Sequence, residues 1–112
     1  MDYKTIFFLN HILENIVKAE SFSKGMTKEE LSKNEFAQYA IVRAIEVIGE
    51  AAKNLPDSFK KEHPKIVWKD IIGTRDIMIH KYFGVDLNIV WDILSIGLPD
   101  LKKKINALLK ET

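Results

Sequence analysis

One segment of the 112-residue chain concentrates the side chains that are suited to chemistry on a phosphate. Residues 71–84 carry Arg75, His80 and Tyr82, and Arg75 is one of only two arginines in the chain. Histidine transfers protons near neutral pH, an arginine fork can hold two phosphate oxygens, and a tyrosine hydroxyl can orient the same group. RNA cleavage without a metal needs a base for the 2′-hydroxyl, a fixed cation for the developing negative charge and a proton for the leaving oxygen. The segment therefore predicts phosphodiester chemistry.

The spacing of these residues has meaning only on a helix. Arg75 and His80 are five positions apart, about 140° around a helix with 3.6 residues per turn, so they would flank a common surface. Asp76 and His80 are one turn apart on the same face, and we expect these two side chains to interact. A helix that ends near Gly84 would present a guanidinium, an imidazole and a phenol at one end.

Each of these residues also has a purely structural interpretation. Arg75 could pair with a buried carboxylate, His80 could be a hydrogen-bonded core histidine, and Tyr82 could be a half-buried aromatic residue at a helix end. The combination Arg-x4-His-x-Tyr in one short segment favours the chemical interpretation, because a chance match among such rare residue types is uncommon. The sequence offers no glycine-rich phosphate loop, no Cys/His metal spacing and no serine-centred elbow, so we expect neither a metal nor a cofactor.

A second polar group lies in the apolar stretch 44–52. A lone carboxylate among apolar neighbours is costly, so Glu46 and Glu50 are expected to pair with Arg43 or Arg75. Gly49, between the two glutamates, predicts the close approach of another helix. We interpret Arg43, Glu46 and Glu50 as structural support for the site rather than as catalytic groups.

The other basic candidates have weaker functional signals. His11 and His63 are expected at the surface or in a loop. The three lysines at 102–104 are typical of a solvated helix face, and an RNA-facing patch is the alternative.

Composition describes an ordinary globular chain with a net charge of +1, 46% hydrophobic and 29% charged residues. Near-neutral charge means that any basic surface must be local or built by two subunits. The absence of cysteine excludes disulfides and thiolate metal sites and is compatible with a cytoplasmic protein. The apolar run at residues 6–9 is too short for a signal peptide or a membrane span. We expect a single domain over residues 1–112.

Apolar spacing predicts helices and no strand. Long helices are expected from residue 2 to about 22, from 35 to 55, from 68 or 70 to 82, and from Asp86 to the C-terminus, with a break or kink before Pro99 and a new helix from Leu98. The sequence Thr27–Glu30 fits a capping box for a short helix, and residues 58–62 fit one more turn. The predicted fold is all-α, an up-and-down four-helix bundle with extra short helices. Phe7 and Phe8 widen the apolar face of the first helix enough to cover a partner subunit.

Three segments of the chain resemble the HepT-like group of HEPN-domain proteins, and the resemblance extends over nearly the whole length. The segments are Ala44–Lys53, Trp68–Tyr82 and Phe83–Trp91. The motif Arg-x4-His-x-Tyr carries most of the likeness, together with a polar residue directly after the arginine. That position is often asparagine in the family and is Asp76 in this chain.

The resemblance implies an HEPN-like homodimer whose paired motif helices form a cleft, acting as a metal-independent endoribonuclease. It also implies the toxin of a HEPN/MNT toxin–antitoxin pair. Arg75 and His80 would be catalytic, and Asp76, Lys81 and Tyr82 would orient the RNA phosphate. The antitoxin would be an MNT-type nucleotidyltransferase that neutralises the toxin by attaching AMP to Tyr82.

An alternative interpretation from another functional class is a non-catalytic binding module, a helical auxiliary subunit of a nucleotidyltransferase. The complete set of Arg75, His80 and Tyr82 favours the enzyme, whereas Asp76 and the low net charge favour the module. A dimer would reconcile the low net charge with RNA binding. Two copies of Arg75, His80 and Lys81 around one groove would create a local positive field on a nearly neutral protein.

Overall fold

A computed structural model describes residues 1–80 and 86–111, and at residues 77–80 it describes the backbone without the side chains. The elements of the described chain are all helical, with no strand among them. They are α1 (Tyr3–Ser23), α2 (Lys28–Lys33), α3 (Glu35–Lys53), α4 (Asp57–Glu62), α5 (Trp68–His80), α6 (Leu87–Asp92), the π-helical segment η2 (Ile93–Gly97) and α7 (Leu98–Lys110). The predicted all-α helical bundle with extra short helices is confirmed.

Helix α1 begins at a side-chain cap and buries one stripe of residues. The carboxylate of Asp2 accepts a hydrogen bond from the backbone N–H of Thr5 at 2.8 Å. Hydrogen bonding from Thr5, by its side chain and then its backbone, lowers the pKa of Asp2. Residues at three- and four-residue spacing face the bundle, as an amphipathic helix requires. They are Thr5, Leu9, Ile12, Asn15, Ile16 and Ala19.

Local signals also set the connection from α1 to α3. Gly25 adopts φ 76°, a left-handed conformation that glycine reaches without strain, and it turns the chain away from α1. Thr27 and Glu30 form the predicted capping box, each bonding the other's backbone N–H at 3.1 Å. Asn34 then ends α2 and starts α3, because its side chain accepts a hydrogen bond from the Ala37 backbone N–H at 3.0 Å.

Helix α3 is the centre of the bundle, since it packs along both α1 and α5. Its buried residues occupy much of its circumference, which agrees with a helix covered on two sides. They are Ala37, Ile41, Val42, Ala44, Ile45, Ile48, Gly49, Ala51 and Ala52. The helix ends at Lys53, two residues before the predicted end, where the backbone N–H of Asn54 bonds the carbonyl oxygens of Glu50 and Ala51.

The C-terminal stretch differs from the prediction at Pro99. The predicted second helix does begin at Leu98. Of the predicted break or kink, the break is absent, because the π-helical segment η2 joins α6 to α7 without an interruption. The backbone N–H of Leu98 bonds the carbonyl of Ile93, five residues back. Proline has no N–H to donate, and in an α-helix its ring clashes with the carbonyl four residues earlier, here Ser95. The wider turn accommodates that ring.

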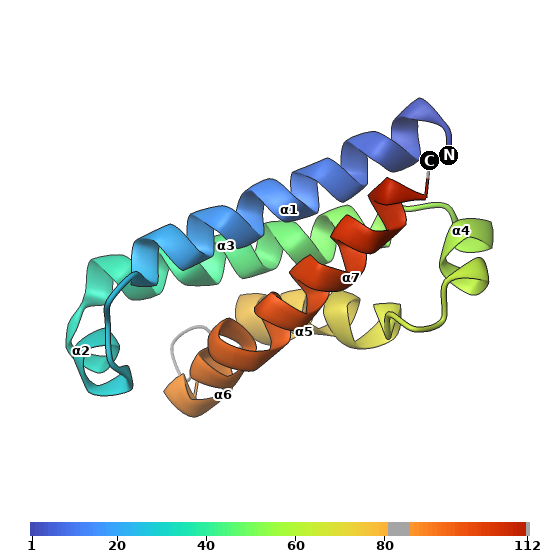
Figure 1. Ribbon diagram of the computed structural model, residues 1–112. Helices are drawn as coiled ribbons and strands as arrows, with labels where there is room; N and C mark the ends of the chain where they lie inside the picture. The colour runs from blue at the N-terminus through green and yellow to red at the C-terminus, as the bar shows by residue number, and fades with distance from the viewer. Residues whose placement is uncertain (81–85, 112) are drawn as a thin grey trace.

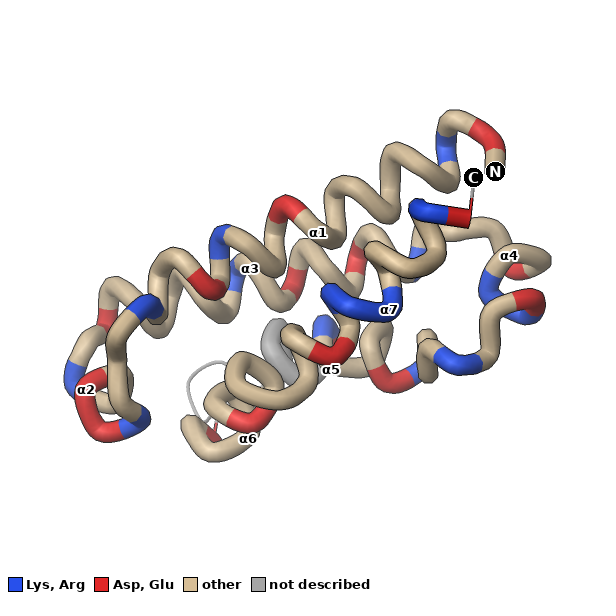
Figure 2. Tube along the Cα trace, in the orientation of Figure 1, with Lys and Arg blue, Asp and Glu red and all other residues tan. Residues whose placement is uncertain are grey.

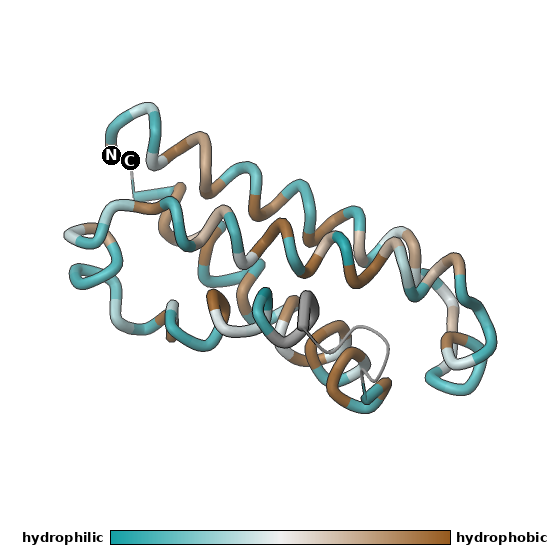
Figure 3. The backbone as a smooth tube through the Cα atoms, turned by 180° about the vertical axis from the view of Figure 1, so that it is seen from behind, coloured by the Kyte–Doolittle hydropathy of each residue, from teal (hydrophilic) through white to brown (hydrophobic). Residues whose placement is uncertain are grey.

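The bundle is elongated, with principal extents of 42, 27 and 20 Å. Figure 1 shows α1 and α3 running side by side, with α5 and α7 on one side of them and with α2 and α4 at opposite ends. Seen from behind in Figure 3, hydrophobic and hydrophilic positions alternate along the helices, as expected for amphipathic helices. The largest fully buried side chains are Leu9, Ile12, Ile16, Leu31, Ile41, Ile45, Ile48, Val90 and Ile105.

Charged residues are interleaved rather than gathered on one side. Figure 2 shows basic and acidic positions mixed along the described helices. This distribution agrees with the net charge of +1. None of the helices in the described part of the chain combines the length and the apolar character needed to cross a membrane.

Candidate active site

The two helices that carry the predicted site residues approach closely at Gly49. A Cβ atom added to this glycine of α3 would lie 2.7 Å from the Cβ of Arg75 and 3.1 Å from the carbonyl oxygen of Ile71, both on α5. Real Cβ atoms do not approach other atoms this closely, so any side chain at position 49 would push α5 away. The close helix approach that the sequence predicts at Gly49 is confirmed, and it fixes where the Arg75 side chain leaves α5.

The Arg75 guanidinium lies between two carboxylates. Its Nη2 is 3.8 Å from Oε1 of Glu50 on α3, and its Nη1 is 3.7 Å from Oδ1 of Asp76 on its own helix. Both separations exceed hydrogen-bond length, so these are loose ion pairs. The Arg75 side chain is 26% exposed, and its buried Nε has no hydrogen-bond partner among the described residues. A buried donor without a partner costs stability and is therefore worth a functional explanation.

The second predicted support pair is tighter. Arg43 donates from Nη1 to Oε2 of Glu46 at 3.2 Å, one turn apart on α3. The pairing of these glutamates with Arg43 and Arg75 therefore agrees with the sequence prediction. The expectation that both carboxylates lie in apolar surroundings is correct only for Glu46, whose side chain is 18% exposed. The Glu50 side chain is 49% exposed.

The remaining motif residues are described only in part. Arg75 and His80 belong to one helix, α5, as predicted, but the His80 side chain lies outside the described residues. Lys81 and Tyr82 lie wholly outside them. The predicted contact between Asp76 and His80 therefore stays a prediction. The contact of Asp76 with Arg75 was not predicted, because neighbouring residues on a helix point in different directions.

The other basic candidates have structural partners. Lys102 pairs with Glu20 of α1 at 2.9 Å, and Lys104 pairs with Asp100 at 2.9 Å within α7. His11 stacks on Phe7, with ring centroids 5.9 Å apart. In the described structure, lysines 102 and 104 thus belong to a solvated, paired helix face.

His63 follows α4, and so lies in a connection as predicted. Its ring packs 4.5 Å from that of Phe59, and its backbone carbonyl accepts a hydrogen bond from Trp68 Nε1 at 3.1 Å. His63 therefore helps to hold the start of α5 against the bundle rather than facing the Arg75 site.

A hollow that the sequence did not predict lies between α3, α5, η2 and α7. Its volume is about 290 Å³. Most of the lining side chains are apolar, and because they come from four helical elements and the connection before α5, no local pattern in the sequence reveals the hollow. The lining residues are Ile45, Ile48, Ile66, Val67, Asp70, Ile71, Thr74, Ile93, Gly97, Leu98, Asp100, Leu101 and Lys104. Arg75 is not among them, so this hollow is separate from the phosphate-binding candidate.

Comparison with known proteins places this chain among relatives named as ribonucleases. One relative is a protein of Methanocaldococcus jannaschii whose name combines a gamma-glutamylcyclotransferase with a provisionally assigned RNase. It is 43% identical over 104 residues, or 93% of this chain. The chain spans about half of that relative, 47% of its length. A protein of Thermococcus cleftensis named "probable ribonuclease HepT" is 40% identical over 103 residues, covering 92% of this chain and 94% of the relative.

A third relative, from Caldanaerobacter subterraneus subsp. tengcongensis and named as a provisional RNase, is 39% identical over 104 residues, with 93% of each chain covered. No solved structure gives a significant match. Residues 12–108 match the family described as ribonuclease HepT-like. The chain therefore belongs to the HepT-like ribonuclease family, which confirms the predicted family and enzyme class.

Proposed function

We propose that the chain is a metal-independent endoribonuclease and the toxin of a HEPN/MNT toxin–antitoxin system, in which Arg75 binds the scissile phosphate and His80 transfers protons. One observation carries the proposal. The Arg75 side chain is partly open to solvent, it is held only loosely by its two carboxylates, and its Nε has no partner among the described residues. A guanidinium with spare donors is suited to the oxygens of a phosphate.

In the proposed reaction, the imidazole of one His80 takes the proton of the RNA 2′-hydroxyl, and the 2′ oxygen attacks the adjacent phosphorus. The bond from phosphorus to the 5′ oxygen breaks, and a second, protonated imidazole gives its proton to the leaving oxygen. The products are a 2′,3′-cyclic phosphate and a 5′-hydroxyl. Arg75 stabilises the added negative charge on the non-bridging oxygens, while Asp76, Lys81 and Tyr82 orient the phosphate.

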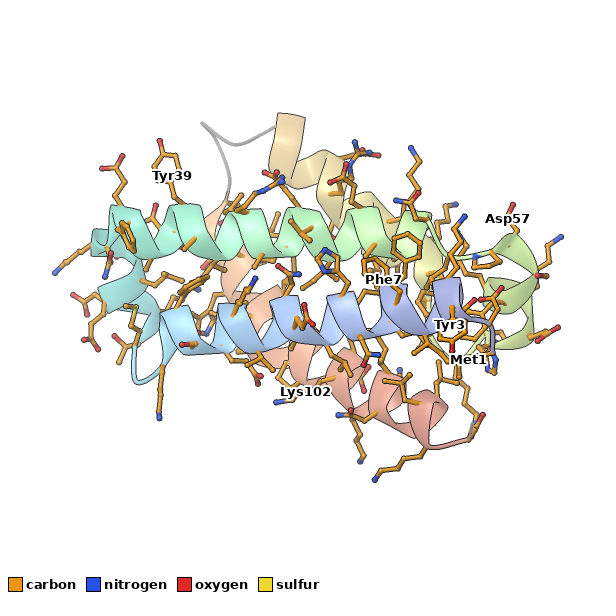
Figure 4. The ribbon with its side chains drawn as sticks, turned by 90° about the horizontal axis from the view of Figure 1, so that it is seen from above. Met1, Tyr3, Phe7, Tyr39, Asp57 and Lys102 are labelled. Carbon is orange, nitrogen blue, oxygen red and sulfur yellow. The ribbon has the colours of Figure 1, made fainter. Side chains whose placement is uncertain are left out.

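The two imidazoles come from a homodimer. Two aromatic side chains one turn apart on α1 support dimer formation, with Tyr3 94% and Phe7 62% exposed in the single chain. Figure 4 shows Tyr3 and Phe7 on α1 beside α3. Exposed apolar surface of this kind is typical of a face that another subunit covers. Phe8, expected on the same face, packs against the core instead.

The proposed partner is an MNT-type nucleotidyltransferase that attaches AMP to Tyr82. An AMP group on this residue would place a bulky anion beside the two phosphate-binding arginines, and so would exclude RNA by volume and by charge. Intact-mass measurement of the chain, with and without co-expression of such a nucleotidyltransferase, tests this step. We expect a mass increase of whole AMP units that a Tyr82→Phe variant lacks. An unchanged mass would contradict it.

The alternative function is a non-catalytic module that assists a nucleotidyltransferase. One observation favours it, since both charged neighbours of Arg75 among the described residues are carboxylates, which reduce the positive potential available to RNA. Such a module would bind the phosphate of a nucleotide and would form a stable complex with the nucleotidyltransferase, without cleaving RNA.

RNA cleavage by the purified protein in the presence of EDTA tests the enzyme proposal. We expect the wild-type protein to cleave and to leave 2′,3′-cyclic phosphate ends, and we expect Arg75→Ala and His80→Ala to lose cleavage while remaining dimers by light scattering. Undiminished cleavage by both variants would exclude the proposed site. An inactive wild-type protein that binds the nucleotidyltransferase tightly would favour the auxiliary module.

A further inference from the structure

We propose that Glu50 is an exchangeable counter-ion of Arg75, which positions the guanidinium in the free protein and is displaced by an RNA phosphate on binding. The inference rests on the proposed function and adds a residue of α3 to it. Glu50 is a positioning residue in this scheme, since it acts through Arg75 and does not touch the reacting atoms.

The Glu50–Arg75 ion pair has the geometry of a weak contact that another anion can replace. Oε1 of Glu50 is 3.8 Å from Nη2 of Arg75, too long for a hydrogen bond, so the two groups attract each other without being locked together. Glu50 is 49% exposed and can swing into solvent, and the Arg75 side chain is 26% exposed. A carboxylate and a phosphate present similar oxygens to a guanidinium, so one can replace the other.

The Cβ of Arg75 is held against Gly49, so only the guanidinium end of the side chain can move. The Cβ of Arg75 lies directly over Gly49, in a space that would not admit even a methyl group on α3. Its Nε is buried and lacks a partner among the described residues. With the base of the side chain held and Nε unsatisfied, the guanidinium has donors to offer an incoming anion without a large rearrangement.

The neighbouring pair on α3 shows what a permanent contact looks like in this protein. Arg43 and Glu46 form a true hydrogen bond at 3.2 Å, and the Glu46 carboxylate is mostly covered, at 18% exposure. Asp76 also differs from Glu50, because it follows Arg75 on α5 and therefore moves with it. Among the residues whose side chains are described, Glu50 alone reaches Arg75 from a separate helix, so it can be left behind when the guanidinium turns to a phosphate.

Displacement of Glu50 has a consequence in the salt dependence of binding. Each phosphate that a protein cation neutralises releases counter-ions from RNA. A freed Glu50 attracts a cation from solution, which cancels part of that release. Without the carboxylate, binding should be tighter and should depend more steeply on salt concentration.

The test measures the Kd of a labelled 2′-O-methyl RNA, which cannot undergo attack by its 2′ oxygen, by fluorescence anisotropy over a series of salt concentrations. The proteins are the wild type, Glu50→Gln, Glu50→Asp and the matched control Glu46→Gln, which removes the same charge from the same helix. For Glu50→Gln we expect binding about two- to fivefold tighter at low salt, the range of a partly exposed charge pair. We also expect the slope of log Kd against log salt to steepen, by less than the roughly 0.7 that one neutralised phosphate contributes. Glu50→Asp should keep the wild-type slope, and Glu46→Gln should change Kd less.

Equal effects of Glu50→Gln and Glu46→Gln would overturn the inference, since general charge would then explain both. Weaker binding by Glu50→Gln, or no binding by any of the four proteins, would overturn it as well. Cleavage of unmodified RNA by the wild type is measured in parallel. Cleavage with identical salt slopes in all variants rejects the role of Glu50 and leaves the ribonuclease standing. The expected binding pattern without cleavage supports the role of Glu50 at an anion site and rejects the proposed catalysis.

Discussion

The apolar core and the Gly49–Arg75 contact use the same helix, α3, in opposite ways. In the core, α3 contributes large side chains such as Ile41, Ile45 and Ile48, which are at most 2% exposed and pack in one cluster with residues of α1 and α7. At the contact with α5, α3 contributes a glycine, and α5 places an arginine over it. Apolar volume stabilises the first region. In the second, the absence of a side chain brings the helices together.

This difference separates stability from activity. A core of close-packed aliphatic residues contributes free energy through burial and tolerates little loss of volume. The Gly49–Arg75 contact leaves a buried nitrogen without a described partner and two ion pairs at more than 3.5 Å, so it adds little to stability. We therefore expect substitutions in the two regions to have separable effects.

Arg75→Ala should have the largest effect, and it should fall on activity. We expect RNA cleavage to fall about 100- to 1,000-fold, the usual loss when one charge-stabilising donor is removed from an active site. The midpoint of urea unfolding should change little, because the lost ion pairs are weak. Arg75→Lys serves as the control, since it keeps the charge but not the fork and should restore only part of the rate. Loss of the folded state in Arg75→Ala would contradict the expectation that the Gly49–Arg75 contact contributes little to stability.

Ile12→Ala tests the core side of the comparison. Ile12 is fully buried, and truncating such a residue costs about 2–5 kcal/mol of unfolding free energy. Urea unfolding followed by circular dichroism measures this loss. The cleavage rate per folded molecule should stay at the wild-type value. A selective loss of rate with an unchanged unfolding midpoint would show that the two regions are not separable.

Gly49→Ala adds one methyl group inside the Gly49–Arg75 contact, where one atom affects both the packing of α5 and the position of Arg75. The new Cβ would meet the Cβ of Arg75 at 2.7 Å, so α5 must shift, at a cost of about 1–3 kcal/mol for an overpacked contact. The shift should also displace Arg75 and reduce cleavage. Gly97→Ala is the matched control, because a Cβ at that glycine meets no atom within 4 Å. Equal unfolding midpoints for the two variants would contradict the close approach.

Asp2→Asn should have the smallest effect, and it concerns only the start of α1. The pKa of Asp2 is lowered from its ordinary value of 3.8 by hydrogen bonding from Thr5, so the charged form is favoured in the folded state. Its contribution to stability is therefore complete above pH 3.8 and is lost as the pH falls through the lowered folded-state pKa. Asparagine still caps the helix, so the variant should lose only the pH-dependent contribution of Asp2 to the free energy of unfolding. Unfolding curves at neutral and acid pH compare the two proteins.

Much of the fold could be predicted because its signals are local. Asp2, Thr27, Asn34 and Asp86 each cap a helix within three residues of their own position, so the caps are readable in the sequence. The π-helical segment was not predicted, since the presence of Pro99 indicates a distortion but not whether the helix breaks or widens. Either outcome accommodates the proline ring, so the local sequence does not decide between them.

The site was predictable where partners are set by helical spacing. Arg43 and Glu46 are one turn apart, and Gly49 predicted the close approach of another helix. The prediction gave Arg43 or Arg75 as partners of the two glutamates and left open that Glu50 would be the one to pair with Arg75. The contact between Arg75 and Asp76 was not predictable. Consecutive helical positions point about 100° apart, and only the length of the arginine side chain allows the two groups to meet.

Phosphate binding by Arg75 is tested most directly by measuring whether RNA reaches its guanidinium. The chain has two arginines, so a spectrum of protein labelled with ¹⁵N-arginine contains two Nε–H signals, and Arg43 provides an internal reference. On titration with 2′-O-methyl RNA, we expect the Arg75 signal to shift and to saturate together with binding, and the Arg43 signal to move much less. An Arg75 signal that stays in place while RNA binding saturates would contradict the proposal that Arg75 binds the RNA phosphate.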